Sequence, residues 1–131
     1  MSIPASHVDL LERAIIWHVA TIGPKGEPQS SPVWAGIDND GHPVISMLKR
    51  RQKVKNLVAN PSIAMSAYEF DGDGYRHLEL RGTVTIEDDP DHSLIHTMAK
   101  KYLDLDEYPL AQPNDERVTI RVTVNHAATM G

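Results

Sequence analysis

The sequence predicts a mainly β fold with α insertions, a six-stranded and predominantly antiparallel barrel. First, residues 75–87 and 117–125 alternate apolar and polar side chains, which is typical of strands with one buried face. Second, turn sequences such as Asn-Asp-Gly at 39–41 and Asp-Gly-Asp-Gly at 71–74 separate neighbouring strands. Third, only three helical patterns interrupt the strands. The 131 residues are expected to form a single domain, 1–131.

The first half of the chain is expected to contain a short helix and three strands. Ser6 can cap the helix, because its hydroxyl can accept a hydrogen bond from a backbone amide of the first turn. The strand at 15–22 is apolar on both faces, so we expect it inside the barrel wall or beneath a partner subunit. A Pro-Lys-Gly-Glu-Pro turn leads to a second strand at 29–37, and the Asn-Asp-Gly turn leads to a third at 43–48.

The second half is expected to contain two helices and three strands. A short helix follows the third strand and ends before Pro61, because the residue before a proline is disfavoured in helical conformation. Strands at 62–70 and 75–87 come next, and Gly82 on the apolar face of the latter indicates a bulge or a close backbone approach. The main helix is predicted at 90–103, with a proline in its first turn, and a polar loop then leads to the last strand.

The composition argues against several classes of protein. The formal net charge is −5, so general binding of nucleic acid is not expected. There are no cysteines, which excludes disulfides, a thiolate nucleophile and a cysteine-based metal site. No apolar run approaches the roughly 18 residues of a membrane-spanning helix, and no secretion signal is evident. We therefore expect a cytoplasmic protein with no membrane partner.

Five basic residues nevertheless lie close together in this acidic chain: Lys49, Arg50, Arg51, Lys53 and Lys55. They fall where a predicted strand ends and a predicted helix begins. A helix N-terminus offers unpaired N–H groups and partial positive charge, and arginine and lysine add full charges that suit a phosphate. The pattern fits a site for a phosphorylated ligand, but it also fits a solvated basic turn, and both interpretations stay open.

Other patterns favour structural roles. His92 and His96 are four residues apart on the predicted main helix, which is the spacing of a zinc motif, but the glutamate that such motifs also need is missing. We expect surface histidines and no metal site. Trp34 could pack in the core or contact a bound ring. Ser30 and Ser31 lack the context of a nucleophile elbow, and no catalytic residue is predicted.

Four segments of the chain carry a resemblance to a known family. They are His-Val-Ala-Thr at 18–21, Gly-Glu-Pro-Gln-Ser-Ser-Pro-Val-Trp at 26–34, the basic segment and helix at 51–61, and Leu-Arg-Gly-Thr-Val at 80–84. In their order and spacing the chain resembles the pyridoxamine 5'-phosphate oxidase-like FMN-binding split β-barrels, in particular their actinobacterial deazaflavin-dependent branch. The resemblance covers nearly the whole chain. It implies a homodimeric split barrel with cofactor sites at the subunit interface.

The resemblance also implies a cofactor and the residues that bind it. The cofactor would be the deazaflavin coenzyme F-420, with FMN as the alternative, since both present a phosphate to the same motif. The basic residues would bind the phosphate, the second-strand segment would lie along the ring system, and the others would frame or line the site. The implied cofactor-binding residues are Ser31, Pro32, Val33, Trp34, Ser46, Met47, Arg51, Lys53, Lys55 and Tyr75.

The implied function is that of an oxidoreductase that transfers hydride between the deazaflavin and a small conjugated or planar organic substrate. The cofactor carries that chemistry, so a dedicated acid or base is not required. Two other functions stay open. The chain could be an FMN-dependent oxidoreductase of the same family, or it could bind flavin or haem without turnover. A third possibility is a structural dimer whose basic turn is merely exposed.

Overall fold

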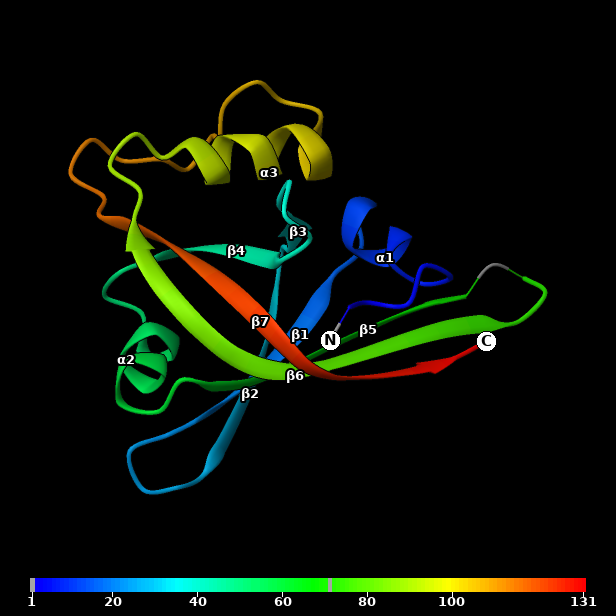
Figure 1. Cartoon of the computed structure of the whole chain (residues 1–131). Helices are drawn as coiled ribbons and strands as arrows, with labels where there is room; N and C mark the ends of the chain where they lie inside the picture. Colours follow the sequence, from blue (N-terminus) through cyan, green and yellow to red (C-terminus); the bar gives the residue numbers. More distant parts are fainter. Residues whose placement is uncertain (1, 71) are drawn as a thin grey trace.

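The structure, a computed structural model, describes residues 2–70 and 72–131. Within these ranges the chain forms seven strands and three helices. The strands make one antiparallel sheet in the order β2-β1-β5-β6-β7-β4-β3. Figure 1 shows that the sheet curls, with the long strands β6 and β7 crossing the molecule together. The expected mainly β, split-barrel architecture is thereby confirmed.

Long strands at the centre of the sheet connect its two ends. β6 and β7 have 14 residues each and pair along nearly their whole length. Of the predicted turn between β5 and β6, Asp71 lies outside the described residues. The strands are β1 (Trp17–Ile22), β2 (Pro28–Val33), β3 (Gly36–Ile37), β4 (Pro43–Leu48), β5 (Ser62–Phe70), β6 (Tyr75–Asp88) and β7 (Arg117–Met130).

The prediction of six strands is wrong by one, because the expected strand at 29–37 divides in two. β2 pairs with β1, whereas β3 pairs with β4 at the opposite end of the sheet. Between them, Ala35 hydrogen-bonds to side chains instead of to a neighbouring strand. Its N–H donates to the hydroxyl of Tyr102 at 3.1 Å, and its carbonyl accepts from Nζ of Lys101. The chain therefore crosses from one end of the sheet to the other.

The last strand is longer than predicted and reaches Met130 instead of residue 125. The pairing of β6 with β7 shifts between Arg81 and Gly82, so Asn125 is the extra residue of a bulge. A bulge changes which side chains face the core, and the simple alternation stops there. The expectation for Gly82 is confirmed, because a Cβ at this position would lie 2.0 Å from the carbonyl oxygen of Thr123.

The three helices are α1 (Asp9–Glu12), α2 (Gln52–Ala59) and α3 (Ser93–Leu103). The main helix α3 begins at Ser93, three residues later than predicted, because the carboxylate of Asp89 satisfies its first amides. The Asp89 oxygens accept hydrogen bonds from the N–H groups of Ser93 at 3.2 Å and Leu94 at 3.0 Å. Burial opposes the charge on Asp89, but these hydrogen bonds outweigh it and hold the pKa of the carboxyl below its usual value.

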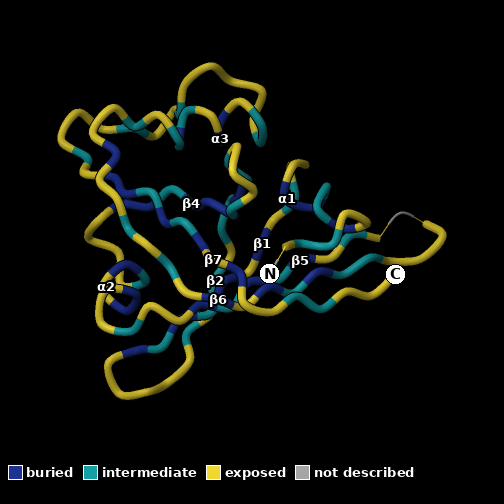
Figure 2. The backbone as a smooth tube through the Cα atoms, in the orientation of Figure 1, coloured by how far each residue is buried: buried dark blue, intermediate teal, exposed yellow. Residues whose placement is uncertain are grey.

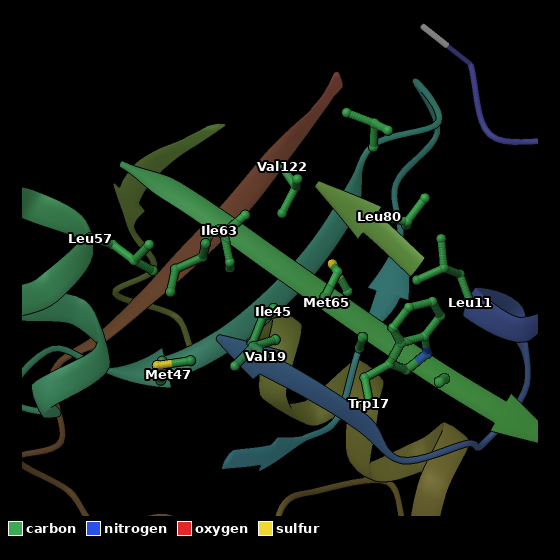
Figure 3. Close-up of a cluster of buried hydrophobic side chains, with 14 of the residues drawn as sticks. Leu11, Trp17, Val19, Ile45, Met47, Leu57, Ile63, Met65, Leu80 and Val122 are labelled. Carbon is green, nitrogen blue, oxygen red and sulfur yellow. The ribbon is translucent and has the colours of Figure 1, made fainter. Parts of the chain in front are cut away.

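The core lies inside the curl of the sheet. Figure 3 shows Trp17, Met65 and Leu11 packed together, with Leu57 of α2 at the far side of the same cluster. Figure 2 shows the buried positions along the middle strands and in α2, with exposed positions at the hairpin ends and in the loop that follows α3. In the single chain β1 is buried on one face only, and Ile16 just before it is 47% exposed. Burial of the other face beneath a partner subunit stays a prediction.

Candidate functional site

A cavity of about 370 Å³ lies where the ends of β2 and β4 meet the start of α2. The first residue of β7, the helix α3 and the loop at 104–116 complete its wall. Its size falls within the range of cavities that hold cofactors and other small molecules. The lining residues are Pro32, Val33, Trp34, Ser46, Met47, Leu48, Arg51, Lys53, Ile95, Tyr108 and Arg117.

Positive charge gathers at the α2 side of this cavity. Arg51 occupies the position before the first residue of α2, in extended conformation, and makes no side-chain cap to the helix. Lys53 lies in the first turn and is half-buried. Burial, together with the neighbouring charge of Arg51, lowers the pKa of Lys53. The helix N-terminus and two cations therefore face the same space, an arrangement that favours an anion.

Arg117 adds a third cation, which reaches the cavity from β7. It pairs with Leu48 across the sheet and is 8% exposed. Its Nη1 donates to Oγ of Ser46 at 3.3 Å, and its guanidinium carbon lies 5.2 Å from the ring centre of Tyr108. Burial, with a further contribution from Arg51, lowers the pKa of Arg117, while Tyr108 and nearby carboxylates oppose this.

The opposite wall of the cavity is apolar and aromatic. The rings of Trp34 and Tyr102 stack with centroids 4.9 Å apart and planes 8° from parallel. Tyr108 meets Trp34 edge-on at 5.9 Å. The hydroxyl of Tyr102 donates to the carbonyl of Ile15 at 2.6 Å, which fixes the ring that supports Trp34. Trp34 thus packs against other aromatic rings and lines the cavity. Its contact with a bound ring stays a prediction.

The structure brings most of the predicted site residues to this one cavity, and three lie elsewhere. Ser31 precedes the lining segment and pairs with Val19 in the sheet. Lys55 is exposed on α2. Tyr75 begins β6 and touches Tyr68 edge-on at 6.5 Å, away from the cavity of its own chain.

Sequence reasoning missed Arg117, Tyr108, Leu48 and Ile95. Arg117 is the first residue of a strand whose alternation places it among the polar positions, so nothing nearby signals its burial. Tyr108 lies in a loop that folds back because its N–H donates to Nδ1 of His96 at 2.9 Å.

His92 and His96 hold this loop against α3. Nε2 of His92 is 2.8 Å from the carbonyl oxygen of Asp115, and both rings are half-buried, not at the open surface as expected. In the described ranges one other group has metal-ligand spacing: Asp38, Asp40 and His42. Asp38 already accepts hydrogen bonds from the amides of Asp40 and His42 and from Nε of Arg121, so this group forms a closed turn.

Comparisons with known proteins agree with this architecture. Residues 3–131 match the family model for pyridoxamine 5'-phosphate oxidase. A solved structure described as an F420 reductase is 33% identical, with a TM-score of 0.80, and the match covers 95% of this chain and 98% of that one.

Two more distant structures share the fold. A conserved hypothetical protein from Mycobacterium tuberculosis is 21% identical, with a TM-score of 0.78 and coverage of 98% and 84% of the two chains. A FAD-binding protein from Mesorhizobium loti is 18% identical, with a TM-score of 0.67 and coverage of 96% and 93%.

A search of curated proteins found no match. Among the described helices, none has the length and apolar character needed to cross a membrane. The match over 3–131 shows that this chain belongs to the pyridoxamine 5'-phosphate oxidase-like split-barrel family, as the sequence resemblance implied.

Proposed function

We propose that this protein is a cytoplasmic oxidoreductase that uses the deazaflavin coenzyme F-420. It would transfer hydride between the cofactor and a small conjugated or planar organic substrate. The observation that carries the proposal is the cavity itself, where Arg51, Lys53 and Arg117 face an apolar and aromatic wall. A phosphorylated cofactor with a flat ring system has these same two parts. The 33% identical structure described as an F420 reductase supports the deazaflavin.

The basic side of the cavity fits a phosphate. None of the three cations forms an ion pair with any residue that the structure describes. Arg51 at the N-cap makes no side-chain hydrogen bond to the first turn of α2, so its side chain does not compete with an anion for these amides. Each charged hydrogen bond contributes about 1.5–3 kcal/mol. Two or three of them would hold a phosphorylated molecule at micromolar affinity.

The apolar side fits a ring system. Pro32, Val33 and Met47 offer apolar surface from two strands that belong to opposite ends of the sheet. Trp34 stacks on Tyr102, which holds the indole in place at this side of the cavity. When bound, the cofactor would supply the hydride donor or acceptor. The chain would bind and orient it and exclude water, and we assign no acid or base among the lining residues.

We also propose a homodimer that forms through the open face of β1. A second cavity, of about 510 Å³, is lined there by Ile15, Ile16, His18, Ser66, Ala67, Tyr68, Phe70 and His77. Tyr68 and Phe70 are 67% and 68% exposed, which is unusual for aromatic side chains so close together. Tyr75 lies on the same hairpin. It could therefore contribute to a cofactor site only in the partner subunit.

FMN is the second candidate cofactor. Its phosphate and its ring would meet the same cations and the same apolar wall. Fluorescence titrations with coenzyme F-420 and with FMN separate the two, and we expect tight, saturable binding of the deazaflavin with weaker binding of FMN. The reverse order would move the protein to the FMN-dependent enzymes, and binding of neither would refute the proposal.

A double variant tests the site. Arg51→Ala with Lys53→Ala should lower the affinity for the cofactor by a hundredfold or more, because two charged contacts are lost. The matched control is Arg81→Ala with Lys100→Ala, which removes the same charge from exposed positions. Turnover of the reduced deazaflavin with a panel of planar acceptors then tests catalysis. Binding without turnover across that panel would favour a carrier of the cofactor over an enzyme.

A further inference from the structure

The guanidinium of Arg117 is a buried charge without a counter-ion. The residue is 8% exposed, and it forms no ion pair with any part of the chain from 2 to 70 and from 72 to 131. Its hydrogen bond to the hydroxyl of Ser46 is long, at 3.3 Å, and neutral. A buried charge without a partner costs several kcal/mol. An arginine at this position therefore reduces the stability of the folded chain unless something else pairs with it.

Nearby carboxylates do not supply that partner, because each is engaged elsewhere. Asp89 accepts from the first amides of α3. Asp115 accepts from the N–H of Gln112 at 3.0 Å and lies 3.9 Å from Nη1 of Arg50. Tyr108 offers only the face of its ring. The surroundings of Arg117 thus reduce the energetic cost of burying its charge without neutralising that charge.

Arg117 lines the cavity, and one of its donors is unused. Its Nε is buried and has no hydrogen-bond partner among the described residues. A buried charged donor without a hydrogen bond is rare in native proteins and calls for a partner, such as a bound ion or ligand. Arg51 and Lys53 also line this cavity, and no acidic residue is among its described lining residues. The space beside Arg117 is therefore strongly positive.

We propose that Arg117 is a ligand-binding residue that, with Arg51 and Lys53, forms a three-cation site for the phosphate of the cofactor. Arg51 and Lys53 approach from the start of α2, and Arg117 approaches from the neighbouring end of β7. A guanidinium can give parallel hydrogen bonds to phosphate oxygens, which a lysine cannot. The inference rests on the proposed function only for the identity of the ligand; the anion site itself follows from Arg117.

The test compares Arg117→Met with the unaltered protein, using ligands with and without phosphate. The pairs are FMN against riboflavin, and coenzyme F-420 against its ring–ribityl fragment. We expect the variant to bind the phosphorylated ligand at least tenfold more weakly, while its affinity for the phosphate-free ligand changes less than twofold. Arg117→Lys, which keeps the charge, should recover part of the lost affinity. Arg81→Met is the matched control, since it removes one exposed charge far from the cavity.

Thermal unfolding without ligand separates binding from structure. Methionine keeps the apolar length of the side chain and removes the unpaired charge, so the melting temperature of Arg117→Met should stay the same or rise. A structural arginine would instead lower it. A drop in melting temperature with unchanged ligand affinity would overturn the proposal, and so would an equal loss of affinity for FMN and riboflavin.

Inorganic pyrophosphate makes the result independent of the proposed function. Pyrophosphate should raise the melting temperature of the unaltered protein, relative to chloride at the same ionic strength, and should not raise that of Arg117→Met. If neither cofactor bound but this difference appeared, the anion site would stand and the proposed function would fall. If pyrophosphate stabilised both proteins equally or neither of them, the assignment of Arg117 would be refuted.

Discussion

The indole of Trp34 lies flat on the ring of Tyr102, with centroids 4.9 Å apart and planes 8° from parallel. The hydroxyl at the end of that tyrosine bonds to the backbone of Ile15 and of Ala35. One side chain of α3 therefore holds both the tryptophan and the crossing segment between β2 and β3.

Tyr102→Phe should separate the two contributions of this residue. The stack with Trp34 remains, but the hydrogen bonds to Ile15 and Ala35 are lost, so we expect a loss of about 1–2 kcal/mol in the free energy of unfolding. Urea denaturation measures it. Tyr68→Phe, at an exposed position, is the control and should change little. Equal stability of the two variants would show that the hydroxyl of Tyr102 contributes nothing.

Asn56 should be required for the position of α2. It is 3% exposed, and its Nδ2 donates to Oγ1 of Thr21 and to Oε1 of Gln29, both at 2.9 Å. Asn56→Leu leaves these groups unsatisfied, and we expect a loss of about 2–3 kcal/mol. Since Arg51 and Lys53 begin the same helix, affinity for the phosphorylated cofactor should fall as well. Asn39→Leu, in an exposed turn, is the control for both measurements.

Lys101 should make the stability depend on pH above neutrality. Its Nζ donates to the carbonyls of Leu11 and Ala35, and burial lowers its pKa from 10.5 to about 8. Between these values the unfolded chain binds more protons than the folded chain, so stability rises as pH increases from about 8 toward 10.5. Below pH 8 the folded chain bears the whole cost of the charge.

Urea unfolding at several pH values checks this sign. The rise should be smaller in Lys101→Met, which has no titrating amine at this position. Lys100→Met removes the exposed neighbour and should keep the rise. A Lys101→Met protein with the full rise would show that another group causes it.

Gly82→Ala should be among the most damaging single methyl additions. The added carbon would lie 2.0 Å from the carbonyl oxygen of Thr123, and backbone of the paired strand cannot move aside cheaply. We expect a loss of about 3 kcal/mol or more in unfolding free energy. Gly36→Ala is the informative comparison, because its methyl would meet the flexible end of Met98 at 2.7 Å. Similar losses in the two variants would contradict the distinction between backbone and side-chain neighbours.

The sequence predicted strands and turns well where pattern and pairing agree. Alternation located most of β6 and the first part of β7, and Gly82 revealed the bulge. Prediction from the sequence failed where a tertiary hydrogen bond decides the structure. The strand expected at 29–37 breaks because Lys101 and Tyr102 take the backbone groups of Ala35.

The candidate site shows the same division. The basic segment is visible locally, so Arg51 and Lys53 could be named from it, although their role as cofactor ligands stays a prediction. Arg117 could not be found in this way, since only its pairing with Leu48 places it beside them. Tyr108 depends on a bond from its amide to His96.

The walls of the cavity come from strands near the two ends of one curled sheet: β2 is the first strand in the order, and β4 is next to the last. A ligand that touches Pro32 and Ser46 together can therefore bind only after the sheet has closed. Binding then favours the closed chain by mass action, by about 2.7 kcal/mol at a free ligand concentration one hundred times Kd. The cofactor would act as a clasp on the barrel, and protein made without it would open and be degraded sooner than protein that holds it.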